Sequence, residues 1–170
     1  MLTLILPGYS PHNEDWAMET AKQLKLDHDV RPVLWEHWKD PSTKFDEQVV
    51  ADDILSILSD NQINIVAKSI GTLVASHLIQ KTPDKIQKII FSGIPLNDIN
   101  DKAKREIKQA LLKLSESKIL CFQNDKDPHG SGAQIKEFLA EINPDIRLIV
   151  KSGSDHEYPY YSEFLEFLKS

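Results

Sequence analysis

The segment that decides the fold is Ile63-Asn64-Ile65-Val66-Ala67-Lys68-Ser69-Ile70-Gly71-Thr72, which leads into a further apolar stretch ending at Ile79. Residues 63–67 form an apolar run of the length typical of a strand buried on both faces. Residues 70–79 leave little polar surface at helical spacing, so they predict a central helix that is covered by its neighbours. Ser69 therefore stands at a tight turn from a strand into a helix.

The rest of the chain repeats this alternation of strand and helix. Apolar runs, each with the length of a strand buried on both faces, occur at Leu2–Leu6, Val30–Leu34, Ile86–Phe91, Lys118–Phe122 and Ile146–Val150. One-faced helical spacing occurs within 45–58, 107–114, 135–142 and 161–168. This alternation predicts an α/β fold, doubly wound in three layers, with a parallel sheet between two layers of helices. No repeat or linker composition interrupts residues 1–170, so we expect a single domain.

The composition excludes several classes of protein. The 170 residues include 20 Lys and Arg against 26 Asp and Glu, a net charge of −6, so we expect no nucleic-acid or membrane partner. The single cysteine, Cys121, excludes an internal disulfide framework, and no Cys cluster or His-x-x-x-His pair indicates a metal site. No apolar stretch approaches the ~20 residues of a membrane span, and the first run is too short for a signal peptide. We expect a cytoplasmic protein without metal or cofactor, and the sequence carries no signal for its oligomeric state.

The turn at Ser69 has the features of a nucleophile site. A serine at such a turn projects its hydroxyl above the sheet, and the turn requires small residues two positions before and two after it, here Ala67 and Gly71. The Ile70 amide, in the first turn of the helix, is placed to act as an oxyanion donor. A serine that only caps the following helix explains this segment equally well when it is considered alone.

A candidate base and candidate acids follow later strands. A serine hydroxyl needs an adjacent base such as imidazole, and that imidazole needs a carboxylate to orient it. His156 follows the last predicted strand, and Asp127 follows the fifth. Asp125 and Asp98 are alternative acids, and His129 is an alternative base. Because the carboxyl ends of parallel strands meet at one edge of a sheet, we expect Ser, Asp and His to converge there, in one of the three known chain orders.

Four segments carry a resemblance to a known family: Leu6-Pro7-Gly8-Tyr9, Ala67-Lys68-Ser69-Ile70-Gly71, Asp125-Lys126-Asp127-Pro128 and Gly153-Ser154-Asp155-His156. Over nearly its whole length the chain resembles a small α/β-hydrolase, similar to the compact, nearly lidless serine hydrolases of the retinoblastoma-binding-protein type. The resemblance implies a minimal α/β-hydrolase fold that lacks the first two strands of larger members, with six strands in the order 2-1-3-4-5-6. The chain departs from the family at Pro7 and Lys68, where histidine is common.

The resemblance also implies a function. It implies a serine hydrolase that cleaves a small ester, thioester or amide through an acyl-enzyme intermediate, with a small-molecule acyl substrate. By resemblance Ser69 is the nucleophile, His156 the general base and acid, and Asp127 its orienting partner. The loop after the first strand supplies the second oxyanion donor, which we place at the Tyr9 amide; Ile70 supplies the first.

Residues around the expected site suggest substrate contacts. Trp35, directly after the second predicted strand, is the candidate for a substrate wall, and His12 lies close enough to the end of the first strand to touch a ligand. Lys68 is expected to be an exposed lysine. An alternative function is a non-catalytic protein-interaction module on the same scaffold, since fold does not determine function. A nucleotide or flavin binder is disfavoured because the chain lacks Gly-x-Gly-x-x-Gly.

Overall fold

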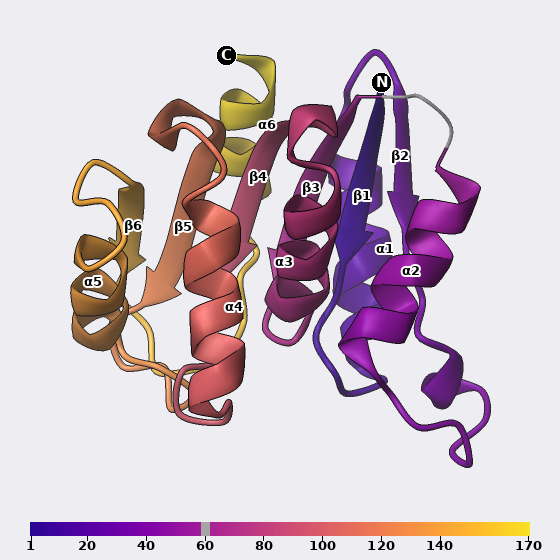
Figure 1. Cartoon of the computed structure of the whole chain (residues 1–170), viewed down its shortest axis with the longest axis horizontal. Helices are drawn as coiled ribbons and strands as arrows, with labels where there is room; N and C mark the ends of the chain where they lie inside the picture. The colour runs from indigo at the N-terminus through magenta and orange to yellow at the C-terminus, as the bar shows by residue number, and fades with distance from the viewer. Residues whose placement is uncertain (59–61) are drawn as a thin grey trace.

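The computed structural model describes residues 1–58 and 62–170, and its centre is a six-stranded parallel sheet (Figure 1). The strands are β1 (Leu2–Leu6), β2 (Asp29–Pro32), β3 (Ile63–Lys68), β4 (Ile86–Ser92), β5 (Ile119–Asn124) and β6 (Arg147–Lys151). Their order is β2-β1-β3-β4-β5-β6, and every neighbouring pair is parallel. The predicted fold class and strand order are confirmed.

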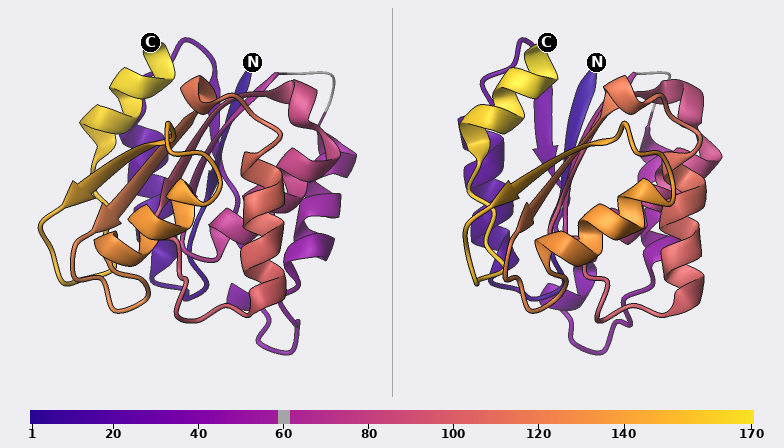
Figure 2. Two further views of the ribbon diagram at one scale, coloured as in Figure 1. Left: turned by 60° about the vertical axis from the view of Figure 1, so that its left-hand side comes forward. Right: turned by 90° about the vertical axis from the view of Figure 1, so that its left-hand side faces the viewer.

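Helices cover both faces of the sheet and form the two outer layers (Figure 2). Helices α1 and α6 lie on one face, and α2, α3, α4 and α5 lie on the other. The α-helices are α1 (Asn13–Gln23), α2 (Glu47–Ile57), α3 (Gly71–Lys81), α4 (Asp101–Leu111), α5 (Gly132–Ala140) and α6 (Tyr161–Lys169). Short 3₁₀ turns occur at Glu36–Trp38, Pro83–Lys85 and Glu116–Lys118.

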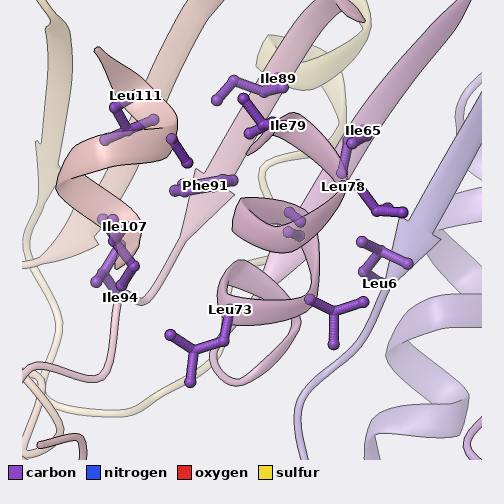
Figure 3. Close-up of a cluster of buried hydrophobic side chains, with 14 of the residues drawn as sticks. Leu6, Ile65, Leu73, Leu78, Ile79, Ile89, Phe91, Ile94, Ile107 and Leu111 are labelled. Carbon is purple, nitrogen blue, oxygen red and sulfur yellow. The ribbon is translucent and has the colours of Figure 1, made fainter. Parts of the chain in front are cut away.

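Alternation along the central strands divides the buried side chains between two cores. In β1, Leu4 and Leu6 point to the side of α3, whereas Ile5 points to the side of α1 and α6. Figure 3 shows Leu73 and Leu78 of α3 in the larger core, together with strand side chains and residues of α4. Helix α3 is buried from Gly71 to Ile79, as its apolar spacing predicts.

The two edge strands differ from the expectation that every run is buried on both faces. The residues of β2 and β6 are exposed or half-buried, whereas those of β1, β3 and β5 are buried throughout. An edge strand has a neighbour on one side only, and the helices at the sheet margins cover it incompletely. Apolar content therefore does not distinguish edge strands from central ones in this chain.

The carboxyl ends of the strands place the candidate residues at one edge of the sheet. In Figure 1 the arrowheads point to this edge, and the loops that follow β1, β3, β4, β5 and β6 gather there. Both termini lie at the opposite edge. Within the described residues, no helix combines the length and apolar character needed to cross a bilayer.

Candidate functional site

Ser69 occupies a strained turn between β3 and α3. Its φ angle is +54°, the one positive φ found for a residue other than glycine in residues 1–58 and 62–170. Such a conformation is unfavourable for a side chain with a β-carbon and persists only where the surroundings hold it. Here the Ser69 amide donates to the Ser92 carbonyl at 2.9 Å, and the Thr72 hydroxyl donates to the Ser69 carbonyl at 2.7 Å. The strained turn that the small residues predict is present.

Gly71 allows the start of α3 to lie directly against the loop that follows β1. A β-carbon at Gly71 would lie 2.2 Å from the Leu6 carbonyl oxygen and 2.8 Å from that of Pro7. Only glycine permits this approach between two stretches of backbone. Within the described part of the chain, the amides of Ile70 and Tyr9, which flank this contact, donate no hydrogen bond. Two unpaired N–H groups thus lie on the two segments that meet at Gly71.

Asp127 and His156 are in direct contact. The Nδ1 atom of His156 lies 2.6 Å from Oδ2 of Asp127, whose side chain is fully buried. Asp127 also accepts hydrogen bonds from the Tyr158 hydroxyl at 2.5 Å and from the His129 amide at 2.8 Å. Burial alone would raise the pKa of Asp127, but these hydrogen bonds outweigh it and hold the pKa below its ordinary value. Asp127 is therefore an ionised carboxylate in direct contact with the imidazole.

The alternative acids and the alternative base have other partners. Asp125 accepts a hydrogen bond from the Gly153 amide at 2.8 Å and so supports the loop after β6. Asp98 lies 2.5 Å from Nδ1 of His129, and the His129 ring lies 4.4 Å from the His156 ring between centroids. The second Asp–His pair thus stands beside the first one.

Ser69 and His156 flank the segment Ser92–Gly93. The Ser69 amide bonds to Ser92, and a β-carbon at Gly93, where φ is +63°, would lie 2.8 Å from Cε1 of His156. Nε2 of His156 is buried and has no hydrogen-bond partner among the described residues, so Ser69 and His156 are not hydrogen-bonded here. The ring nitrogen opposite Asp127 is therefore unpaired among the described residues.

The predicted rim residues divide into buried and exposed ones. Tyr9 is 56% exposed, and its carbonyl accepts hydrogen bonds from the rings of His37 and Trp38 at 2.9 and 2.7 Å. Trp35 is 1% exposed and donates from its indole to the Gly8 carbonyl at 2.9 Å, so it supports the loop from beneath and has little surface left for a substrate. His12 is exposed, with Nδ1 2.7 Å from the Ser10 hydroxyl.

The expectation that Lys68 is exposed is wrong. Its side chain is 1% exposed, and Nζ donates to Oε2 of Glu157 at 2.9 Å. Burial lowers the pKa of Lys68, and the ion pair with Glu157 opposes that shift. Sequence rules place lysine at the surface, and they fail here because the partner lies 89 positions away along the chain.

Sequence reasoning did not assign the groups that surround the Asp127 carboxylate. The Tyr158 hydroxyl shares Oδ2 with His156, and Gln123 Nε2 lies 3.3 Å from the same atom. Tyr158 is two residues after His156, on a loop with no periodic pattern, so no local spacing in the sequence identifies it. Among the described residues, no group of three or more His, Cys, Asp or Glu side chains is arranged as a metal site.

A comparison with known protein families identifies the family to which the chain is related. Residues 19–163 match the profile of a family described as "Alpha/beta hydrolase domain". The chain belongs to this alpha/beta hydrolase family. The matched region contains the segments of Ser69, Asp127 and His156, and the resemblance found in the sequence is thereby confirmed. No curated protein matches the sequence significantly.

Solved structures of hydrolases share the fold of this family member. An alpha-beta serine hydrolase homologue from Coxiella burnetii has a TM-score of 0.72 at 19% identity, covering 99% of this chain and 83% of that one. An α/β serine hydrolase without a lid from Xanthomonas campestris has a TM-score of 0.65 at 14% identity, covering 99% and 77%. The type II thioesterase of the borrelidin biosynthetic cluster has a TM-score of 0.70 at 14% identity, covering 99% and 92%. At these identities the likeness concerns the fold.

Proposed function

We propose that the protein is a serine hydrolase that cleaves a small acyl ester, thioester or amide through an acyl-enzyme intermediate on Ser69. The observation that carries the proposal is the contact of 2.6 Å between Asp127 and His156 Nδ1, with Nε2 buried and unpaired. To complete a Ser-His-Asp triad, this imidazole needs a hydroxyl that donates to Nε2, and the Ser69 hydroxyl is the candidate. Membership of the alpha/beta hydrolase family supports this assignment.

The proposed reaction has two halves. Nε2 of His156 takes the Ser69 proton as the Ser69 oxygen attacks the acyl carbonyl carbon, and the resulting imidazolium then protonates the departing alcohol, thiol or amine. In the second half, His156 deprotonates a water that attacks the acyl-enzyme, and the proton returns to Ser69 as the acid leaves. Asp127 keeps its negative charge throughout and stabilises the imidazolium.

The negative oxygen of each tetrahedral intermediate needs donors. The amides of Ile70 and Tyr9 are the proposed pair, because neither is hydrogen-bonded among the described residues and they lie on the two sides of the Gly71 contact. Ile70 precedes the first residue of α3, where the helix dipole adds to the attraction for negative charge.

The substrate class follows from the surroundings of this site. Helix α4 follows β4 on the chain, and a helix in this place could cover the site only if it stood away from the sheet. It packs on α3 through Ile107 and Leu111 and so belongs to the body of the protein. We therefore propose an open site without a dedicated lid. Thioesterases share the fold, which makes thioesters a first choice beside simple esters. We propose a small acyl compound in the cytoplasm as substrate, with neither nucleic acid nor membrane as partner, in keeping with the net charge of −6.

A fluorophosphonate probe tests the nucleophile. We expect labelling of the wild-type protein and none of Ser69→Ala. Ser76→Ala is the matched control, because Ser76 is a buried serine of α3 whose hydroxyl donates to the Thr72 carbonyl, and this variant should label like the wild type. Hydrolysis of short and medium acyl esters and thioesters should follow the same pattern. Absence of labelling in the wild-type protein would instead favour the non-catalytic interaction module.

A further inference from the structure

Lys68 and Glu157 form an ion pair beside the candidate site that the proposed reaction does not use. Nζ of Lys68 lies 2.9 Å from Oε2 of Glu157, and the side chain of Lys68 is almost completely buried while that of Glu157 is 51% exposed. The ammonium also lies 5.5 Å from the centre of the Trp16 ring. On its solvent side, Glu157 approaches Nε2 of His12 at 3.5 Å.

Lys68 and Glu157 are each adjacent in the chain to a residue of the candidate site. Lys68 is the last residue of β3 and directly precedes Ser69, whereas Glu157 directly follows His156 on the loop after β6. The two strands are separated in the sheet by β4 and β5, so no backbone ladder joins these ends directly. The ion pair therefore links the segment that carries the candidate nucleophile to the segment that carries the candidate base.

Stability alone does not account for a buried lysine at this position. Removing an ammonium from water is costly, and a buried ion pair is often no more stabilising than apolar side chains of the same size. An apolar residue at position 68 would fill the space under Trp16 without that cost. The fixed geometry and the paired charges are what an apolar residue would not supply.

We propose that the Lys68–Glu157 ion pair is a positioning element that fixes the His156 loop relative to the Ser69 turn. This inference rests on the proposed serine-hydrolase function. Neither residue touches the reacting atoms; both act through their neighbours. Loss of the pair lets the loop shift, and proton transfer between serine and histidine depends steeply on that distance.

The pair also contributes balanced charge around His156. Asp127 contacts the ring at Nδ1, and the His129 ring, with Asp98 behind it, and the Tyr158 ring pack against it. The Lys68–Glu157 pair adjoins His156 through Glu157, the next residue in the chain, and carries Asp155 and His12 beside it. Removing one member of the pair leaves the other uncompensated. The protonated and neutral forms of His156 then change in relative stability, with a sign set by the member removed.

The experiment compares Lys68→Met, Glu157→Gln and the double variant with the wild type, using an ester that the wild-type protein hydrolyses. We expect kcat to fall about tenfold to a hundredfold in each single variant, with KM little changed, because a misplaced base slows the chemical step. The double variant should be no slower than the single ones, since all three lack the same link. Lys108→Met with Glu141→Gln is the matched control: this pair joins α4 to α5 away from the site, and its loss should leave kcat unchanged.

The pH profile of kcat/KM gives a readout that simple loss of structure would not move. The acid limb of such a profile reports the protonation of the essential base, here the proposed His156. Glu157→Gln removes a negative charge that favours the imidazolium, so the acid limb should move to lower pH by ~0.5 unit or more, and Lys68→Met should move it to higher pH by a similar amount. The double variant should return the limb close to its wild-type position. Partial unfolding lowers kcat/KM but does not move the pH at which the acid limb, scaled to its own maximum, reaches half height.

The outcomes separate the inference from the function on which it rests. If Ser69→Ala hydrolysed the ester as fast as the wild type, both the serine-hydrolase function and the positioning role would be wrong. Turnover that depends on Ser69 but is unchanged in kcat and in the acid limb by Lys68→Met and Glu157→Gln would overturn the positioning role alone. Slower turnover with limbs that move in the same direction in both single variants would also overturn it, because opposite charges must act with opposite signs.

Discussion

Gly71→Ala is the change that tests the geometry of the candidate site most directly. The added β-carbon would lie 2.2 Å from the Leu6 carbonyl oxygen and 2.8 Å from the Pro7 carbonyl oxygen. Both oxygens belong to the backbone, so no side-chain rotation relieves the overlap. The start of α3 and the loop after β1 must move apart.

The size of the effect follows from these distances. Non-bonded heavy atoms settle near ~3.5 Å, so relief of the 2.2 Å contact requires a displacement of about 1 Å. Overpacking of this kind destabilises a protein by about 1–3 kcal/mol. For a chain of 170 residues this corresponds to a fall in Tm of roughly 2–12 °C. Because Ile70 and Tyr9 lie on opposite sides of the contact, the same displacement separates the proposed oxyanion donors, and we expect kcat to fall about 10²-fold.

The assay pairs thermal unfolding with ester turnover at a temperature where both proteins are folded. Gly132→Ala is the control, because its nearest contact at 2.8 Å is a methyl group of Val150, a half-exposed side chain that can turn away. That variant should keep nearly wild-type turnover. If Gly71→Ala were as stable and as active as the wild type, the backbone contact and the argument for paired amide donors would both be wrong.

Four further predictions concern the buried groups of the site and the core. Asp127→Asn should lower kcat by roughly 10³- to 10⁴-fold, as seen in an ester assay, whereas Asp125→Asn, which removes a loop contact only, should have a far smaller effect; a loss below about tenfold for Asp127→Asn would exclude it as the orienting acid. Tyr158→Phe removes a hydrogen bond to a buried carboxylate and should cost about 1.5–3 kcal/mol in urea unfolding; an unchanged midpoint would show that this bond contributes nothing. The pKa of Asp127 in the folded protein lies below its unfolded value of ~3.9, so the ionised carboxylate stabilises the fold above that pH, and this contribution is lost as pH falls through the folded pKa. The free energy of unfolding of the wild type should therefore decline more steeply below about pH 5 than that of Asp127→Asn. Parallel curves for the two proteins would contradict the lowered pKa. Burial raises the pKa of Cys121 to about 12, so a thiol reagent at pH 8 should leave it unmodified until urea unfolds the chain, and rapid reaction of the native protein would show that the thiol is accessible.

Much of the architecture is local in origin, which is why the sequence predicts it. Buried parallel strands need continuous apolar runs, and the runs at β1, β3, β4 and β5 lie within a residue or two of their structural bounds. Helix α1 is different: sequence reasoning assigned it no residue range. Its buried face is a narrow stripe that includes Asn13 and Thr20 beside Trp16 and Ala17, so polar residues interrupt the apolar period.

Chain order and strand topology predict which loops form the candidate site, but not which side chains are in contact there. Ser69, Asp127 and His156 follow strands whose ends share one edge, and this brings the right loops together. The position of Asp127 before Pro128 at the turn of the loop favours it over Asp125, but the sequence does not show which carboxylate turns inward toward His156. Tyr158 and the partner of Lys68 were missed for the same reason: both contacts form between segments distant in sequence, and no local period records them.

Both ends of the chain lie at the edge of the sheet opposite the loops of the candidate site (Figure 1). A reporter domain, an affinity handle or a solid support attached at either end would therefore stand behind the sheet and leave the reactive rim facing the medium. The scaffold is thus suited to immobilised or fused formats, in which the candidate site stays open to solvent on the side away from the attachment.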